Sequence, residues 1–252
     1  MKLYLLRVGA DSTNLGGGFY SHICQDSRSY TFIPIKDDEQ NLIIERAITY
    51  QDCTWNNRPI PVDYLPRQIR EEPAQYYVHN DPEFETFTYG APESNRNNYR
   101  ILVEIMQTGD MLTFYAAFSN NVHDIDGYYF FAYFIVDRVV MLIFPDRFIE
   151  EDRNLVLRNH HFIHIEALQN QEQVIVIGNR EQSRVFQKAV LLSSRNDREG
   201  VNYRPCQRIR SLLGGYNKSM NRSSIRNIPL SEERIDRFKN YLDESGGRLQ
   251  DP

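Results

Sequence analysis

Short runs of aromatic and β-branched residues recur along the first half of the chain. Residues 3–8, 29–35, 75–78 and 111–118 are such runs, and each is bounded by Gly, Pro, Asp or Asn. The apolar types fit a pleated, half-buried surface and the bounding types favour turns, so the pattern predicts strands. The chain also contains 16 Tyr and 14 Phe, which favours a β-rich fold in the same way.

The longest apolar run is YYFFAYFIVDRVVMLIF at residues 128–144. It is shorter than the ~20 residues that a helix needs to cross a bilayer, and Asp137 and Arg138 interrupt its middle. We therefore expect a core segment and no membrane partner. The Tyr, Phe, Val and Ile content favours one long strand or two joined strands over a helix, although periodicity alone does not separate them.

Helical periodicity is found in three segments. Residues 97–110 place Ile101, Leu102, Ile105 and Met106 on one face and end near Gly109. Residues 145–159 combine Pro145 and an acidic first turn with later apolar positions. Residues 230–247 begin at a candidate N-cap, Ser231, and end at Gly246. The sequence thus predicts an α+β fold: one β-rich domain over residues 1–252, with a mixed, partly barrel-like sheet and a few flanking helices.

Charge is distributed unevenly along the chain. Residues 195–228 hold eight Lys/Arg against two acidic residues, a net charge of +6, although the whole chain carries −5. A compact basic segment on an acidic body is typical of a local anion site, and Tyr203 and Tyr216 within it offer rings on which bases could stack. The alternative is a solvated loop whose arginines pair with the acidic body.

Cysteine usage gives information about the compartment. Cys24, Cys53 and Cys206 are odd in number, far apart and without a CxxC spacing, and no charged-then-apolar signal precedes the first predicted strand. We expect reduced thiols and a cytoplasmic protein.

Three consecutive glycines at residues 16–18 lie between the first two predicted strands. Glycine lets another group approach the backbone closely, but it loses the most conformational entropy on folding. The alternatives are a flexible turn and a cradle for phosphate or a nucleotide.

A second candidate anion site is VIVIGNREQSRVFQKAV at residues 174–190. The pattern predicts a strand at 174–177, a turn at Gly178 and Asn179, and a short helix carrying Arg184 and Lys188 four positions apart. Free N–H groups at such a helix N-terminus attract anions. The glycines of a dinucleotide fingerprint or a P-loop are missing, so a plain connection is the alternative.

Candidate acid–base residues occur in two segments. NHHFIH at 159–164 brings His160, His161 and His164 together without a recognised zinc spacing, so we expect proton transfer or hydrogen bonding rather than a metal site, or a structural histidine. In DPEFETFTYG at 81–90, an extended strand would place Asp81, Glu83 and Glu85 on one face. Repulsion between these carboxylates could raise a pKa and suit proton transfer, although such groups more often face water.

The pair GDMLTFYAAF (109–118) and YYFFAYFIVD (128–137) resembles the Gly-Asp, Phe-Tyr-Ala and Tyr-Phe-x-Val pattern of the nucleotide modification associated domain of the third type. This family occurs in phages, bacteria and archaea. LRVGAD, the glycines at 16–18, YTFIPI, DPEFETFTYG, Asn159 with His161 and Phe162, SRVFQKAVLLS and SSIR resemble its other blocks in the same order. Asp26-Ser27 departs from the family's usual Asp-Gly, and His160 is additional.

The resemblance implies a protein directed at a nucleotide or nucleic acid, DNA rather than RNA, and linked to hypermodified bases, with no assigned reaction. It is either an enzyme that processes a modified base, a non-catalytic reader similar to PUA-like and EVE-like domains, or a scaffold subunit. No cofactor signature is visible, and the oligomeric state stays open. The matched positions imply catalytic candidates at Asp11, Asp81, Glu83 and His161. Those implied for substrate or phosphate binding are Gly16, Gly17, Tyr89, Ser183, Arg184, Lys188 and Arg226.

Overall fold

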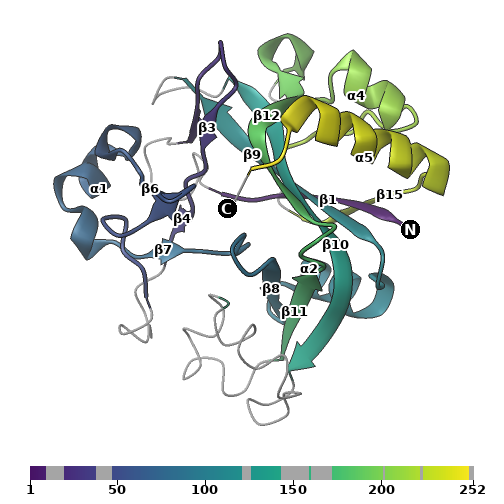
Figure 1. Cartoon of the computed structure of the whole chain (residues 1–252), viewed down its shortest axis with the longest axis horizontal. Coiled ribbons are helices and arrows are strands. Elements are labelled where there is room, and N and C mark those ends of the chain that lie inside the picture. The colour runs from purple at the N-terminus through teal and green to yellow at the C-terminus, as the bar shows by residue number, and fades with distance from the viewer. Residues whose placement is uncertain are drawn as a thin grey trace.

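The computed structural model describes residues 1–9, 20–37, 47–120, 126–142, 159, 172–200, 202–221 and 224–249. Within these ranges, nine strands form one mixed sheet in the order β15–β1–β9–β10–β11–β8, with β12 paired to β10, β2 to β9 and β3 to β2 (Figure 1). Their bounds are β1 Leu3–Arg7, β2 Ser21–Ile23, β3 Tyr30–Thr31, β8 Thr88–Pro92, β9 Met111–Ser119, β10 Gly127–Leu142, β11 Gln173–Gly178, β12 Arg184–Ser194 and β15 Arg226–Ile228. The sheet curls into a half-barrel, which confirms the mixed, partly barrel-like α+β prediction.

Shorter elements complete the described chain. The small strands pair as β4 (Ile35–Lys36) with β7 (Val78–His79), β5 (Thr54–Trp55) with β6 (Arg58–Pro59), and β13 (Arg198–Glu199) with β14 (Asn202–Tyr203). The α-helices are α1 (Arg67–Glu71), α2 (Arg96–Arg100), α4 (Gln207–Leu212) and α5 (Glu232–Gly246). A π-helical turn, Ile101–Ile105, continues α2.

The central strand β9 is buried at every position. Successive side chains of a strand point to opposite faces, so its residues divide between two cores. Phe114 packs on one face with Phe131 and Phe134, whereas Tyr115 packs on the other with Phe130. Both faces of the sheet must therefore be covered.

One face is covered by α4 and α5, which lie together on the same side of the sheet (Figure 1). Ile235, Phe238 and Leu242 of α5 recur at helical spacing and are fully buried. The Phe238 ring meets that of Phe130 edge to face, with 5.5 Å between centroids. The predicted helix at 230–247 is confirmed, and Ser231 occupies the N-cap position without a side-chain capping hydrogen bond.

The other face is covered by aromatic side chains and a small lobe. Phe32, Trp55 and Phe84 pack around Phe131, and the Phe32 and Phe131 rings stack at 4.9 Å. Beyond them α1 and the short strands β4 to β7 enclose a separate cluster that includes Leu65 (Figure 1). The lobe therefore joins the sheet through aromatic contacts.

Several sequence predictions need correction. Residues 128–142 of the run at 128–144 do form one long strand, β10, and residues 143–144 lie outside the described residues. The run at 29–35 instead divides into β3 and β4. The helix predicted at 97–110 ends at Ile105, and Gly109 lies beyond it, with φ +84°, in the turn before β9. Of the helix predicted at 145–159, all but Asn159 lies outside the described residues, and a single domain over 1–252 stays a prediction. No helix in the described part of the chain is long and apolar enough to cross a membrane.

Phe238→Ala tests the packing of α5 on the sheet. We expect the free energy of unfolding to fall by about 3–5 kcal/mol, because the substitution leaves a cavity beneath a fully buried ring. Denaturant unfolding measures the change. Asn240→Ala, on the exposed side of the same helix, should stay within about 0.5 kcal/mol of wild type. Equal losses in both variants would contradict this packing.

Candidate functional site

The acidic segment 81–90 forms a tight turn. Glu83 and Thr88 exchange two backbone hydrogen bonds, with N–H···O distances of 2.9 and 3.0 Å, and Phe87 has φ +54°. The prediction of an extended strand with Asp81, Glu83 and Glu85 on one face is therefore wrong. Glu83 is 8% exposed, whereas Glu85 points to solvent.

The carboxylate of Asp81 belongs to a buried polar cluster. Its Oδ1 accepts hydrogen bonds from the Gly90 N–H at 2.9 Å and from Asn159 Nδ2 at 3.2 Å. Asn159 is fully buried and also donates to Thr88 Oγ1 at 3.1 Å. Glu83 accepts from the Thr86 hydroxyl at 3.0 Å. These contacts of Asp81 and Glu83 hold the hairpin and the single described residue of segment 159–164 together.

Tyr89 connects this cluster to the opposite edge of the sheet. Its hydroxyl accepts a hydrogen bond from Asn98 Nδ2 at 3.3 Å, and Asn98 Oδ1 accepts the N–H of Ile225 at 2.8 Å. Burial, reinforced by the nearby charge of Asp81, raises the pKa of Tyr89 well above its usual range. The phenol therefore stays protonated at neutral pH and serves as a hydrogen-bonding group, not as a base.

Ser183 fills a gap in the backbone ladder of the sheet. The long strand β10 pairs with β12 over residues 127–133 and with β11 over residues 136–142. Between these two stretches, the Asn179 N–H donates to the Ile135 carbonyl at 2.7 Å. The Ile135 N–H donates to the Ser183 hydroxyl at 3.0 Å. A helix carrying Arg184 and Lys188 was the wrong prediction, because both residues lie in strand β12. Lys188 is exposed there.

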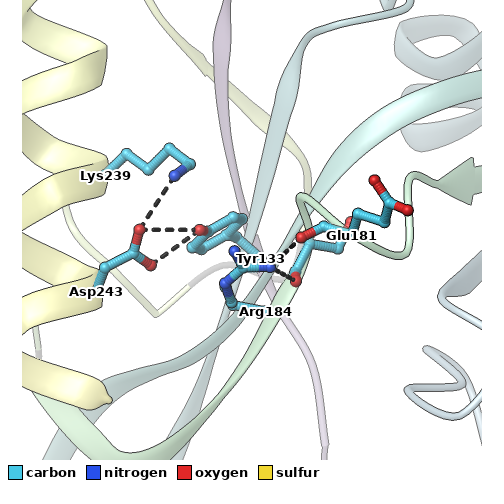
Figure 2. A network of polar contacts seen from close by, with 6 residues as sticks. Tyr133, Glu181, Arg184, Lys239 and Asp243 are labelled. Atoms are coloured by element: carbon cyan, nitrogen blue, oxygen red, sulfur yellow. Dashed lines mark hydrogen bonds and ion pairs between the residues drawn. The ribbon is translucent and has the colours of Figure 1, made fainter. Parts of the chain in front are cut away.

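Arg184 lies beside a polar network that fastens α5 to the sheet (Figure 2). The Tyr133 hydroxyl donates to Asp243 at 2.8 Å, and Lys239 Nζ donates to the same carboxylate at 3.0 Å. Arg184 itself donates to the carbonyl oxygens of Ser183 and Glu181. Burial and the adjacent carboxylate raise the pKa of Tyr133. The described contacts of Arg184 therefore support local structure.

Arg226 belongs to a different group of residues, which we call the arginine–tyrosine cluster: Arg7, Tyr115, Tyr128 and Arg226. Arg226 lies in β15 opposite Leu5, and Arg7 lies opposite Tyr115 in β9. Arg7 Nη1 donates to the Tyr128 hydroxyl at 3.2 Å, and the Tyr115 and Tyr128 rings are 5.9 Å apart. The Tyr115 hydroxyl donates to the Met220 carbonyl oxygen at 3.1 Å, and Arg226 Nη1 lies 3.4 Å from Met220 Sδ. Burial raises the pKa of Tyr115, and the charges of Arg226 and Arg7 partly oppose the rise.

Both ends of the glycine-bearing segment attach beside this cluster. The Val8 N–H donates to the Tyr115 carbonyl at 2.9 Å, and Ser21 pairs with Phe118 where the chain returns as β2. Tyr115 and Phe118 are about 10 Å apart along β9. The segment that carries Asp11, Gly16 and Gly17 is therefore anchored twice to one strand.

The structure brings together some of the predicted site residues. Asp81, Glu83 and Tyr89 share the turn formed by residues 81–90, which we call the acidic hairpin. Tyr89 is linked through Asn98 to Ile225, the residue before Arg226. Arg184 and Lys188 lie in β12, where Arg184 lies beside the α5 network and donates to the Ser183 and Glu181 carbonyl oxygens. The remaining predicted residues lie outside the described ranges: Asp11, Gly16, Gly17 and His161. Sequence reasoning missed Arg7, Tyr115, Tyr128 and Asn98, since each reads as part of a strand or helix.

The basic segment 195–228 is partly neutralised within the fold. Arg204 pairs with Glu199, and Arg195 lies 3.9 Å from Asp126. Arg208 lies over the Tyr241 ring at 5.3 Å. These contacts favour a solvated loop whose arginines pair within the protein over an anion site formed by the whole segment. Arg226 is the residue of this segment that belongs to the arginine–tyrosine cluster. Among the described residues, no group of three His, Cys, Asp or Glu side chains could hold a metal ion.

The half-barrel sheet and its polar strand ends define an α+β protein with a candidate anion site at the end of β1. A family model described as nucleotide modification associated domain 3 matches residues 2–223 of the 252 residues. The chain therefore belongs to this family, which confirms the resemblance seen in the sequence and associates the protein with nucleotide modification. No curated protein sequence matches the chain, and no solved structure does.

Asn98→Ala tests the connection between the acidic hairpin and β15. Without the side-chain oxygen, the buried Ile225 N–H loses its partner, so we expect a loss of about 1–3 kcal/mol in the free energy of unfolding. Thermal or denaturant unfolding gives the value. Asn97→Ala, exposed in the same helix, is the matched control and should have little effect. A neutral Asn98→Ala would show that the two elements are held independently.

Proposed function

We propose that the protein binds a nucleotide or a nucleic acid, DNA rather than RNA, and that Arg7 and Arg226 hold its phosphate during the processing of a modified base. One observation carries this proposal: two half-buried guanidinium groups from the paired strands β1 and β15 lie beside the Tyr115–Tyr128 pair. Arg7 Nη1 donates to the Tyr128 hydroxyl at 3.2 Å, and Arg226 Nη1 lies 3.4 Å from the sulfur of Met220, whose carbonyl oxygen accepts the Tyr115 hydroxyl. Guanidinium groups match phosphate geometry in bidentate hydrogen bonds, and partial burial strengthens such contacts. Membership of the family supplies the link to nucleotides.

The twice-anchored segment supports the same assignment. It leaves the sheet immediately after Arg7 and returns beside Phe118, so its anchors flank the proposed phosphate site. We propose that Gly16 and Gly17 keep this segment thin enough for a nucleotide to lie beside Asp11. Ligand-binding residues are commonly carried by such connections on a rigid sheet.

In the enzymatic form of the proposal, His161 and Asp11 transfer protons. Asp81 and Glu83 act as supporting groups, because their described hydrogen bonds go to their own hairpin and to Asn159, two positions before His161. Ser183 and Arg184, which the sequence assigns to substrate or phosphate binding, have described hydrogen bonds to backbone groups near the start of β12, and we propose that they support the sheet there. For Lys188, phosphate binding stays the proposed role. A reader without turnover is the second candidate, and the engagement of both hairpin carboxylates in hydrogen bonds favours it.

The arginine–tyrosine cluster predicts a defined salt dependence. Arg7→Ala and Arg226→Ala should each weaken binding of single-stranded DNA and lower the slope of log affinity against log salt by about 1, because one fewer counterion-releasing contact remains. Fluorescence anisotropy over a salt series measures the slope. Arg96→Ala, exposed in α2, is the control. Unchanged slopes in both cluster variants would place the phosphate elsewhere.

His161→Ala separates the enzyme from the reader. An imidazole with an ordinary pKa exchanges protons at neutral pH, so in an enzyme its removal should lower the rate roughly a hundredfold while binding is kept. In a reader the same change should weaken binding by about 1–3 kcal/mol, with no turnover in either protein. Binding and product formation are measured together on modified nucleotides and modified DNA. If both survive, His161 has a structural role.

A further inference from the structure

A cavity that shares no lining residue with the arginine–tyrosine cluster lies at the edge of the sheet. Its volume is about 430 Å³. The strands β2 and β3 line one side, the β5–β6 hairpin and Tyr64 line another, and Phe186, Gln187 and Leu249 complete it. A cavity of this volume falls within the range of small-ligand sites. We call it the edge cavity.

Flat rings form much of the wall of the edge cavity. His22 and Tyr64 stack with their centroids 3.8 Å apart and their planes 3° from parallel. Trp55, which is half-buried, and Tyr30 lie along the same lining. The Tyr30 hydroxyl donates to the carbonyl oxygens of Phe186 and Phe131, at 2.7 and 3.2 Å, so its ring is held in place. The wall is preorganised for a planar partner.

Much of the remaining lining is polar and bears a positive charge. Arg58 is exposed in β6 and lines the cavity together with Asn56, Ser29, Thr31 and Gln187. Burial lowers the pKa of His22, so its imidazole is neutral at neutral pH and offers both a donor and an acceptor. Purely apolar ligands would leave these groups unsatisfied. A planar ligand with hydrogen-bonding edges and an attached anion fits all three features.

We propose that the edge cavity binds an unpaired nucleobase, stacked against the Trp55 and His22–Tyr64 rings, with its phosphate at Arg58. The nucleotide identity of the ligand rests on the proposed function, but the location does not depend on Arg7 or Arg226. Base stacking on aromatic side chains is tolerant of sequence, and hydrogen-bonding side chains around a stacked base read its edge. The base comes from a free nucleotide or from a single-stranded nucleic acid.

Trp55 is the only tryptophan of the chain, so its fluorescence reports on the edge cavity directly. The protein is titrated separately with deoxynucleoside monophosphates, with a short single-stranded DNA oligonucleotide and with the matching duplex. We expect the monophosphates, the single strand or both to quench the Trp55 fluorescence. Quenching by monophosphates indicates a free nucleotide, and quenching by the single strand alone indicates a base within a strand. The proposal would be overturned if neither the monophosphates nor the single strand quenched the fluorescence.

Two variants localise the binding. Tyr64→Ala should weaken it roughly five- to a hundredfold through lost stacking, and Arg58→Ala should lower the salt slope by about 1. Arg67→Ala removes an exposed arginine of the same lobe and should change neither quantity. If binding falls in Arg226→Ala but not in these variants, the edge cavity is the wrong location while the proposed function survives. The reverse result supports the edge cavity and contradicts the phosphate site.

Alkylation of Cys24 decides the question should Tyr64→Ala fail to fold, which its melting temperature will show. Cys24 is exposed and lines the cavity, whereas Cys53 is buried with a pKa raised to about 12, so it reacts only after unfolding. Deoxynucleoside monophosphates or single-stranded DNA should slow iodoacetamide labelling of Cys24 but leave that of the half-exposed Cys206 unchanged. Equal labelling of Cys24 in the absence of ligand and in the presence of each of the two would overturn the proposal.

Discussion

The burial of β9 on both faces is the constraint on which the rest of the structure depends. A strand without an exposed position needs an apolar layer above and below it, so α4 and α5 cover one face and aromatic side chains cover the other. β9 accordingly carries no charged side chain, although Thr113, Tyr115 and Ser119 are buried polar members of it. The ionisable side chains of the candidate sites lie elsewhere, Arg7 at the end of β1 and His22 in the short strand β2. Both candidate binding sites follow from this arrangement.

The sequence predicted β1, β9 and β10 from their continuous runs of aromatic and β-branched residues, and α5 from its helical periodicity. It failed at β12, where residues 185–190 are two buried, two exposed and two buried in turn. This pattern imitates a helix, but it arises because β12 advances from Val185 to Val190 while β10 advances only from Ala132 to Phe130. The extra residues bulge outward, and such an irregularity depends on the partner strand, so one strand's sequence does not reveal it.

The candidate site was predictable only in part, for a related reason. Arg226 stood out within a basic segment, but Arg7 reads as the polar end of an apolar strand, and its proximity to Arg226 arises from the pairing of β1 with β15. In the acidic hairpin, the alternation of carboxylates and aromatics suggested a strand. The two-way backbone pairing of Glu83 with Thr88 produces a turn instead, and it directs Asp81 towards Asn159, a residue 78 positions away. Long-range contacts of this kind leave no periodic signal.

The anchoring of β1 and β2 to one strand has a consequence for how this fold can diversify. Among the described residues, the sheet fixes where the chain leaves, at Val8, and where it rejoins, at Ser21. Doubling the length of a flexible connection costs only about 0.6 kcal/mol in closure entropy. A change of length between these two anchors would therefore cost the core little stability.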